Sequence, residues 1–362
     1  MKLGIIGLPQ VGKQTLFNLL TQGKTEKTKG RNVGAIHELP LLGIAEVREE
    51  RLAKLAQIYQ SRKITPVTVE YFLFPNIQND AEKTRQLLSG LSDTNAVVHL
   101  VRAFTDESIF HASGSVDVFR DIERINDELI FSDLFKIERR FERLEKELKK
   151  LKDTLKEKEF EALKKCKALL EDGTFLREAE FSAEEEKLIR GFQFLTQKGL
   201  LIIINVDENK LNDFELLNKI REKYQRRNTT CIQVSVKVEQ EINQLPESER
   251  AEYMDALGIK KSAMEEITQS SFRLLDLVEF FTAGEQESRA WSIRRGKNAQ
   301  QAGGEIHSDI ERGFIRAELI KYNDLMSSDG NPAKAKEKGI FYLKGKDYIV
   351  EDGDILLFRF NV

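Results

Sequence analysis

The stretch GLPQVGKQT, residues 7–15, decides how the first part of this chain folds. Gly7, Gly12 and Lys13 match the pattern G-x-x-x-x-G-K-S/T, in which backbone N–H groups and the lysine hold phosphate oxygens. The last position of the pattern carries Gln14, where a hydroxyl normally binds Mg²⁺. The stretch therefore predicts a phosphate-binding loop whose metal-binding position is altered.

The residues on either side of the loop fit the order strand, loop, helix. Lys2–Ile6 is an apolar run typical of a buried parallel strand, and residues 14–21 have the apolar spacing of a helix. Lys13 would then reach the β- and γ-phosphates from the helix N-terminus. The alternative is a glycine turn with a lysine that faces solvent. The candidate phosphate-binding residues are Gly7, Gln10, Val11, Gly12, Lys13, Gln14 and Thr15.

Further apolar runs alternate with helical stretches along the chain. Because strands that alternate with helices form a doubly wound, mostly parallel sheet, we predict the α/β class, with the ligand at the carboxyl ends of the strands. The strand candidates are residues 68–74, 96–102 (AVVHLVR), 200–206 (LLIIINV) and 230–236, and helical candidates include residues 49–59 and 213–226.

A second motif follows the LLIIINV strand, where this fold places its base-recognition loop. GTPases carry N-K-x-D there, and the Asp accepts two hydrogen bonds from guanine. Here Val206 replaces the Lys and the longer Glu208 replaces the Asp, so the preference for guanine is weakened. Alone, N-x-x-E is more often a strand end than a site. With the phosphate loop it adds Asn205, Val206 and Glu208 to the candidate site, and Ser235 and Val236 could close over the base with their backbone amides.

Between the two strands AVVHLVR and LLIIINV lies a helical pattern, and we expect an inserted antiparallel coiled-coil hairpin over residues 125–196. Residues 138–167 hold 12 basic and 8 acidic side chains, which form either a solvated coiled-coil face or a weak contact to a phosphate backbone. The apolar seam consists of Leu134, Ile137, Phe141, Leu144, Leu148, Leu151 and Leu155, and the return helix would contribute Phe160, Leu163, Cys166 and Leu170.

After Leu277 the sequence changes to short alternating stretches separated by glycine, which indicate a small mixed β domain. These stretches are residues 288–293, 313–320, 347–350 and 355–360.

The bulk properties of the 362 residues narrow the function classes. The net charge of −3 gives no general attraction to nucleic acid or membrane, and no apolar run approaches 18 residues, so we expect no membrane contact. The four histidines form no zinc-hydrolase pair. Cys166 and Cys231 match no metal spacing and are expected to be free thiols in a reducing cytoplasm.

Together these residues resemble the YchF/Obg-like ATPase family of the translation-factor class of P-loop proteins. In that family the loop reads GLPNVGKST, and its N-x-x-E matches Asn205–Glu208. Residues 289–320 and 345–362 resemble its TGS domain, a β-grasp module, and VDVFRDIERINDEL (116–129) resembles the family's entry into its helical domain. The resemblance implies a P-loop nucleotide-binding domain (1–124 and 197–277), a helical hairpin (125–196) and a TGS domain (278–362).

The resemblance also implies ATP as the nucleotide in preference to GTP. It implies a ribosomal partner, rRNA or ribosomal protein, that is bound through the TGS and helical domains. We expect a cytoplasmic monomer.

This chain departs from the family at its magnesium and switch residues. Besides Gln14, residues 35–43 align with switch I and place His37 where a magnesium-binding Thr belongs. The family's D-I-A-G aligns with residues 73–76, so Leu73 replaces its Asp and Asn76 its γ-phosphate-facing Gly. We therefore assign no catalytic and no metal-binding residue, doubt that magnesium is used, and expect nucleotide binding with little hydrolysis. The alternatives are an active ATPase or GTPase with a rebuilt magnesium site, or a purely structural role.

Overall fold

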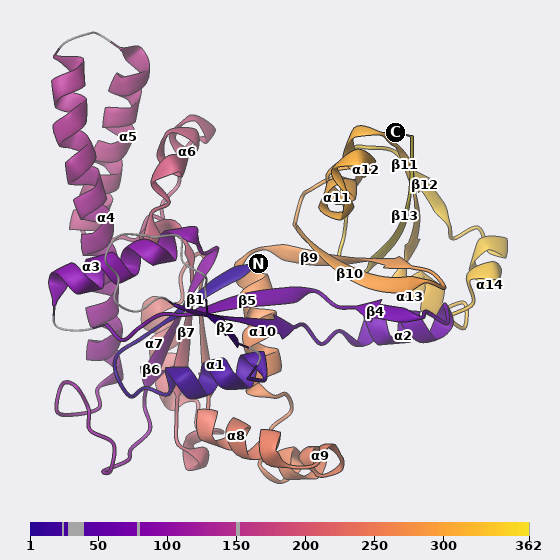
Figure 1. The fold of residues 1–362 in the computed structure, drawn as a ribbon, viewed down its shortest axis with the longest axis horizontal. Coiled ribbons are helices and arrows are strands. Elements are labelled where there is room, and N and C mark those ends of the chain that lie inside the picture. The colour runs from indigo at the N-terminus through magenta and orange to yellow at the C-terminus, as the bar shows by residue number, and fades with distance from the viewer. Residues whose placement is uncertain (24, 28–39, 78–79, 150–152, 362) are drawn as a thin grey trace. The chain divides into compact units, whose positions relative to one another are not determined.

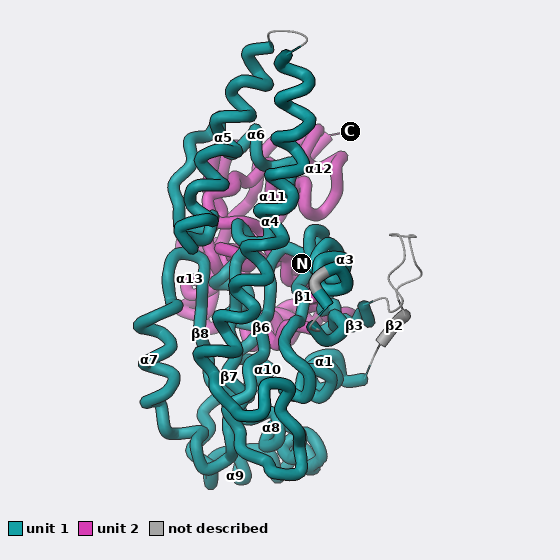
Figure 2. Tube along the Cα trace, turned by 90° about the vertical axis from the view of Figure 1, so that its left-hand side faces the viewer, with its two compact units in different colours: residues 1–45, 70–274 teal, residues 46–69, 275–362 magenta. Residues whose placement is uncertain are grey.

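The computed structural model describes residues 1–23, 25–27, 40–77, 80–149 and 153–361. These residues form two compact units, drawn in different colours in Figure 2. Unit 1 comprises Met1–Ala45 with Glu70–Leu274, and unit 2 comprises Glu46–Val69 with Leu275–Val362. In the described part of the chain, no helix combines the length and the apolar character that a membrane span needs.

Unit 1 is built on a sheet of seven strands among the described residues (Figure 1). In sheet order the strands are β2 (Thr25–Lys27), β3 (Leu41–Glu46), β5 (Thr68–Leu73), β1 (Lys2–Ile6), β6 (Ala96–Arg102), β7 (Gly199–Asn205) and β8 (Thr229–Val234). The pairs of β1 with β5 and β6, and of β7 with β6 and β8, are parallel, whereas β2 runs antiparallel to β3. The predicted α/β class and its central strands are confirmed.

These strands are central because they are apolar on both faces. Every residue of β6 is buried, and so are the last six residues of β7. A sheet covered on both sides favours such continuous apolar runs over alternation. β1 lies between β5 and β6, so the chain order reverses there, and Gly7 follows directly at the carboxyl end of β1. A crevice at such a reversal is the usual ligand site of this fold.

Helices and short 3₁₀ turns connect the strands of unit 1. They are α1 (Lys13–Thr21), α3 (Ala81–Gly90), η1 (Leu91–Asp93), α4 (Val118–Leu148), α5 (Thr154–Glu171), α6 (Ala183–Ile189), η2 (Arg190–Phe192), η3 (Leu195–Gln197), η4 (Glu208–Lys210), α7 (Glu215–Tyr224), α8 (Val236–Gln244), α9 (Glu247–Ala256) and α10 (Ala263–Leu274).

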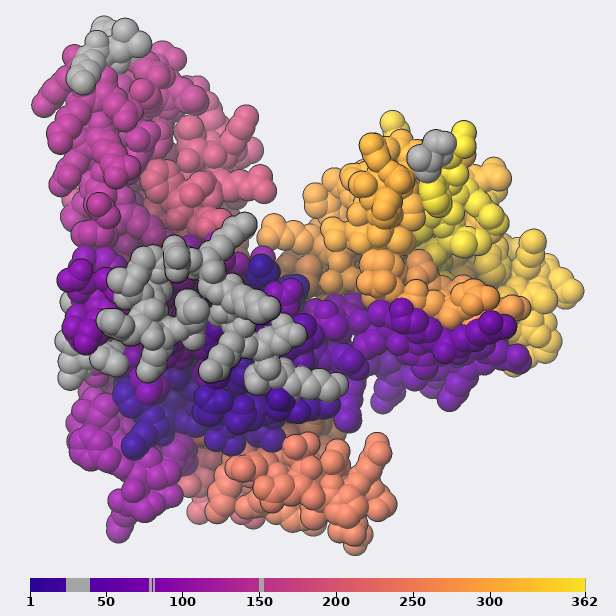
Figure 3. Space-filling view, viewed as in Figure 1, coloured from indigo at the N-terminus to yellow at the C-terminus, as the bar shows by residue number. Residues whose placement is uncertain are grey.

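The expected helical hairpin is present as α4 and α5, which lie side by side in Figure 1. Asp117 caps the start of α4 through its side chain, and Asp153 caps α5 in the same way. The hairpin has a core of its own, to which α6 also contributes, and its side chains form one continuous mass on the face shown in Figure 3. The buried residues of this core are Ile137, Leu144, Ala162, Leu163, Cys166, Leu170, Leu176, Ile189 and Phe194.

The predicted seam is too long. It was expected to run on one helix to Leu155, but α4 ends at Leu148 and Leu155 lies on the return helix, 63 % exposed. The carboxylate of Asp153 accepts hydrogen bonds from the backbone N–H groups of Leu155 and Lys156, which starts a new helix and interrupts the repeat. Leu151 lies outside the described residues.

Unit 2 contains a six-stranded sheet among its described residues. The strands, in sheet order, are β12 (Tyr342–Lys344), β11 (Phe314–Lys321), β13 (Asp354–Phe360), β9 (Leu277–Ala283), β10 (Glu287–Arg294) and β4 (Lys63–Thr65). The helices are α2 (Glu50–Ile58), α11 (Ala299–Ile306), α12 (Ser308–Arg312), α13 (Tyr322–Met326) and α14 (Pro332–Glu337). Phe280, Leu319, Leu356 and Phe358 belong to its buried core. That this unit is a TGS domain stays a prediction.

Two expectations about unit 2 differ from the structure. Residues 46–69 were assigned to the nucleotide-binding domain, but they pack with the C-terminal residues: β4 pairs in parallel with β10, and Arg51 contacts Asp352. Such pairing over more than 200 positions leaves no local signal in the sequence. Residues 347–350 form no strand; only Ile349 makes a bridge, to Asn298.

Candidate nucleotide-binding site

The phosphate loop has the backbone that its glycines predict. Gly7 and Gly12 have φ of 154° and 96°, and Gln10 also has a positive φ of 59°. A Cβ on Gly7 would lie 2.5 Å from the Leu100 carbonyl oxygen, and one on Gly12 would lie 2.9 Å from Nδ2 of Asn205. Glycine is therefore required at both positions. The loop ends where α1 begins, at Lys13, and the first N–H groups of a helix have no partner within it.

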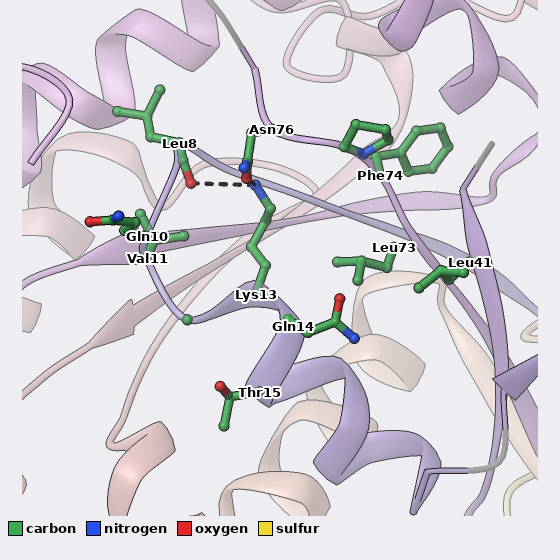
Figure 4. Close-up of a pocket in the computed structure, with 12 residues that line it drawn as sticks. Leu8, Gln10, Val11, Lys13, Gln14, Thr15, Leu41, Leu73, Phe74 and Asn76 are labelled. Carbon is green, nitrogen blue, oxygen red and sulfur yellow. Dashed lines mark hydrogen bonds between the residues drawn. The ribbon is translucent and has the colours of Figure 1, made fainter. Parts of the chain in front are cut away.

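Lys13 is buried and lies inside the loop rather than in solvent. Its ammonium donates to the carbonyl oxygens of Gly7 (2.6 Å) and Leu8 (3.3 Å) and to Oδ1 of Asn76 (2.6 Å; Figure 4). Burial lowers the pKa of Lys13 to about 7. The contact with Asn76 spans 63 residues and was not foreseen from the sequence.

Asn205 joins the phosphate loop to the segments that were predicted to recognise the base. Its Nδ2 donates to the carbonyl oxygen of Val11 (3.0 Å), and its Oδ1 accepts from the backbone N–H of Val236 (3.0 Å). Asn205 and Val206 are buried at the carboxyl end of β7, and Ser235 caps α8. Segments that lie nearly 200 residues apart in the chain thus meet at one edge of the sheet.

Two adjoining cavities hold almost all of the predicted residues. The first, of about 400 Å³, is lined by Leu8, Gln10, Val11, Gly12, Lys13, Gln14, Thr15, Leu41, Leu73, Phe74, Pro75 and Asn76. The second, of about 1150 Å³, shares Gln10, Gly12 and Thr15 with the first and includes Asn205, Val206, Glu208, Ser235 and Val236. Gly7 lines neither cavity and acts through its carbonyl on Lys13. The structure brings the predicted residues together; that they bind nucleotide stays a prediction.

The first cavity does not fit a magnesium ion. Its lining contains amide, hydroxyl, ammonium and hydrocarbon groups but no carboxylate among the described residues, and Mg²⁺ sites use carboxylates with phosphates. Nε2 of Gln14 donates to Oδ1 of Asn18 (3.0 Å), and Figure 4 shows Thr15 pointing in a different direction from Gln14. Within the described residues no cluster of His, Cys, Asp and Glu is suited to a metal ion. His37 lies outside them.

One wall of the second cavity was missed by the sequence analysis. The buried guanidinium of Arg102 donates to the backbone oxygens of Phe104 (3.2 Å), Asp106 (3.1 Å) and Ile109 (3.1 Å), so that the loop after β6 folds around it. Phe104, Asp106 and Ile109 line the cavity. The available signal was an arginine that ends an otherwise apolar buried strand.

Asp207 holds this wall against the base-recognition segment. Its carboxylate accepts hydrogen bonds from the backbone N–H (2.9 Å) and the hydroxyl (3.0 Å) of Thr105. Glu208 makes no such contact among the described residues and is exposed at the start of η4. In the N-x-x-E motif, Asp207 therefore fixes the wall while Glu208 remains available to a ligand.

The family model and the curated relatives identify one family. Residues 277–361 match the family model YchF-GTPase_C, described as a protein of unknown function (DUF933). The chain is 42 % identical over 366 residues to the ribosome-binding ATPase YchF of Bacillus subtilis (strain 168), covering 99 % of each chain. It is 38 % identical to the protein of the same name from Escherichia coli O157:H7, covering 100 % of this chain and 99 % of that one.

Solved structures show the same fold. The Schizosaccharomyces pombe YchF GTPase superimposes with a TM-score of 0.84 at 29 % identity, covering 99 % of this chain and 97 % of that one. A GTP binding protein from Pyrococcus horikoshii OT3 has a TM-score of 0.64 at 18 % identity over the full length of both chains, which supports the fold alone.

Proposed function

The chain belongs to the YchF family, and on that premise we propose that it is a ribosome-associated regulatory protein that binds adenine nucleotide with little or no hydrolysis. The observation that carries the proposal is the position of Asn205. Its side chain, which lines the second cavity, connects the phosphate loop at Val11, in the lining of the first cavity, to the base-side amide of Val236, in the lining of the second. A nucleotide with its phosphates on residues 10–15 would extend past Asn205 into the larger cavity.

Adenine is favoured by the side chains at the end of β7. Guanine recognition in N-K-x-D proteins uses an Asp at a set distance from the base, and the position carries the longer Glu208 here. Val206 is buried and cannot cover the base as the long Lys stem of N-K-x-D does. Both changes weaken guanine recognition, and neither removes a contact that adenine requires.

Weak hydrolysis follows from the phosphate end of the site. Phosphoryl transfer needs a cation that bridges the β- and γ-oxygens, and the protein contributes positioning and charge neutralisation. Leu73 presents hydrocarbon to the first cavity, and Gln14 is hydrogen-bonded to Asn18. Loss of one such electrostatic contact typically lowers the rate by about 10²–10³, and several losses combine without being additive.

Ribosome association is supported by the names of the relatives, and the hairpin has a suitable surface. Most of its lysines are paired with carboxylates, for example Lys165 with Glu185. Arg143 and Lys146 on α4, and Lys149 directly after it, form no ion pair with any residue that the structure describes, and all three are exposed. Such cations suit the phosphate backbone of rRNA. We place this function in the cytoplasm and assign unit 2 a second ribosomal contact.

The proposal is tested by calorimetric titration of the full-length protein with ADP, ATP, GDP and GTP, with and without magnesium. We expect adenine nucleotides to bind more tightly than guanine nucleotides, and Asn205→Ala to weaken binding by about tenfold or more, since it removes two buried hydrogen bonds. Asn218→Ala, at an exposed position of α7, is the matched control and should bind as the unaltered protein does. Guanine nucleotides binding tenfold more tightly than adenine nucleotides would contradict the proposal.

An active ATPase or GTPase is the second candidate. It is favoured by the names of the relatives, which are called ATPases in Bacillus subtilis and Escherichia coli and a GTPase in Schizosaccharomyces pombe. In that case residues outside the first cavity would have to supply the oxygen ligands that its lining lacks. Phosphate release distinguishes the two candidates.

A further inference from the structure

The ammonium of Lys13 has an acceptor for each of its three protons without any ligand. Two are the loop's own carbonyl oxygens, at Gly7 and Leu8, and the third is the side-chain oxygen of Asn76 at 2.6 Å. In a phosphate loop loaded with triphosphate, this lysine reaches the β- and γ-phosphates. Asn76 therefore supplies an oxygen on the side of Lys13 where a phosphate oxygen would otherwise be found.

Asn76 is held in place by its neighbours in the chain. Phe74 and Ile77, on either side of it, are 3 % and 1 % exposed. The backbone N–H of Phe74 donates to the carbonyl oxygen of Ile5 (3.0 Å), which continues the pairing of β5 with β1. Pro75 restricts the backbone directly before Asn76. Asn76 is itself exposed in the loop after β5, and its backbone is anchored by the buried side chains of Phe74 and Ile77.

The surroundings of Asn76 do not suit a third phosphate group. Leu41, Leu73, Phe74 and Pro75 line the same cavity and present hydrocarbon, and among its described lining residues Lys13 is the only charged one. A γ-phosphate would bring about two further negative charges to this wall, where Lys13 is the only cation among the described lining residues and would be shared with the β-phosphate. Burying charge that is only partly paired is unfavourable. The β-phosphate, in contrast, meets the N–H groups at the start of α1.

We propose that this site takes a nucleoside diphosphate in preference to a triphosphate, with the amide oxygen of Asn76 in the place of a γ-phosphate oxygen. The inference rests on the proposed function, because it assumes that the phosphate loop binds nucleotide. A diphosphate leaves the contact between Lys13 and Asn76 intact. A triphosphate must break that contact and place its γ-phosphate against the apolar wall.

The test is calorimetric titration of the full-length protein with ADP and with ATP, in EDTA and again with magnesium. For the unaltered protein we expect ADP to bind at least about tenfold more tightly than ATP under both conditions. Asn76→Ala removes the amide oxygen, so the affinity for ATP should increase by at least about fivefold. The affinity for ADP should change by less than about twofold. Asn76→Asp places a carboxylate on Lys13 and should weaken ATP further. Asn218→Ala serves as the matched control.

ATP binding to the unaltered protein as tightly as ADP would overturn the inference. So would an Asn76→Ala variant in which both affinities change by the same factor. If neither nucleotide binds to any variant while circular dichroism shows that all are folded, the proposed function fails and the inference fails with it. If ATP binds tightly and ADP weakly, only the inference fails. Should Asn76→Ala not fold, the ADP-to-ATP ratio of the unaltered protein and the Asn76→Asp variant decide.

Discussion

At the scale of single residues, two groups of charged side chains have defined partners, one in the candidate site and one in unit 2. Lys13 lies among three oxygen acceptors with no carboxylate beside it, and burial lowers its pKa to about 7. In unit 2, Arg51 binds Glu49 and Asp352, and Glu279 lies 3.5 Å from the same guanidinium. The first arrangement predicts how nucleotide affinity changes with pH, and the second predicts how the stability of unit 2 changes with pH.

Nucleotide affinity is predicted to fall as the pH rises above 7. Free Lys13 loses its proton near pH 7, whereas a bound phosphate favours the charged form, so binding must take up a proton at higher pH. The ADP affinity should decrease between pH 7 and pH 9 by up to about tenfold per unit. Titrations in two buffers of different ionisation enthalpy measure the proton uptake. A Lys13→Arg variant keeps its charge and should show a flat profile; a flat profile for the unaltered protein would contradict the prediction.

The stability of unit 2 is predicted to fall as the pH rises from about 4.5 to about 8. Burial and the neighbouring Glu49 raise the pKa of Glu279 to about 8, while hydrogen bonds from Arg51 lower the pKa of Glu49 although burial opposes this. Between these two pH values the folded state therefore binds more protons than the unfolded state. The protonated Glu279 contributes its full stabilisation below about pH 4.5, and this stabilisation is lost as the pH rises to about 8.

Glu279→Gln imitates the protonated form. It should raise the unfolding temperature at pH 9, corresponding to roughly 1–3 kcal/mol, and have little effect at pH 5. Thermal unfolding at the two pH values measures this difference. Glu285→Gln, at an exposed position of unit 2, is the control and should change neither value. A Glu279→Gln variant that is destabilised equally at both pH values would show that the carboxyl group has a purely steric role.

At the scale of elements, the hairpin of α4 (31 residues) and α5 (18 residues) has its own buried core, and an aspartate side chain caps the start of each helix. Leu144 is fully buried in this core, whereas Leu155, near the start of α5, is 63 % exposed. Leu144→Asp should destabilise the hairpin by roughly 3–5 kcal/mol, since it buries an unpaired charge and removes packing. Hydrogen exchange should then increase in α4 and α5 while β6 and β7 stay protected.

Leu155→Asp is the matched control for this prediction. It makes the same substitution at an exposed position, in the first turn of a helix, where a negative charge is favourable. Exchange in the hairpin should not change. Loss of protection throughout unit 1 in Leu144→Asp would show instead that the hairpin and the sheet unfold as one unit.

At the scale of the whole molecule, local pattern predicted what depends on local residues. β1, β6 and β7 are apolar runs, and Gly7 and Gly12 mark the loop between β1 and α1, so the nucleotide-binding fold was predicted from residues close together in the chain. The N-x-x-E motif at the end of β7 then indicated the base-side segment at Asn205, and the family resemblance matched it. Most of the remaining features arise from contacts between distant residues, which single-sequence periodicity does not encode, and one arises from a local side-chain cap.

Three particular contacts show why the rest was missed. The hydrogen bond from Lys13 to Asn76 joins the start of α1, which follows β1, to the segment after β5. Residues 46–69 belong to unit 2 because β4 pairs with β10, where Lys63 lies opposite Glu287. The Asp153 cap ends an apolar repeat that would otherwise continue. In each case a partner across the fold, or one side-chain hydrogen bond, outweighed the local pattern.

Phosphate release from ATP by the purified full-length protein tests the central claim most directly. It is measured with and without magnesium and with and without ribosomes, beside a Lys13→Ala control. Because the first cavity offers no carboxylate to a cation among its described residues, we predict turnover near the uncatalysed background, equal for both proteins, with no rescue by Gln14→Ser. Robust magnesium-dependent turnover that disappears in Lys13→Ala would contradict this account and establish an active nucleoside-triphosphatase.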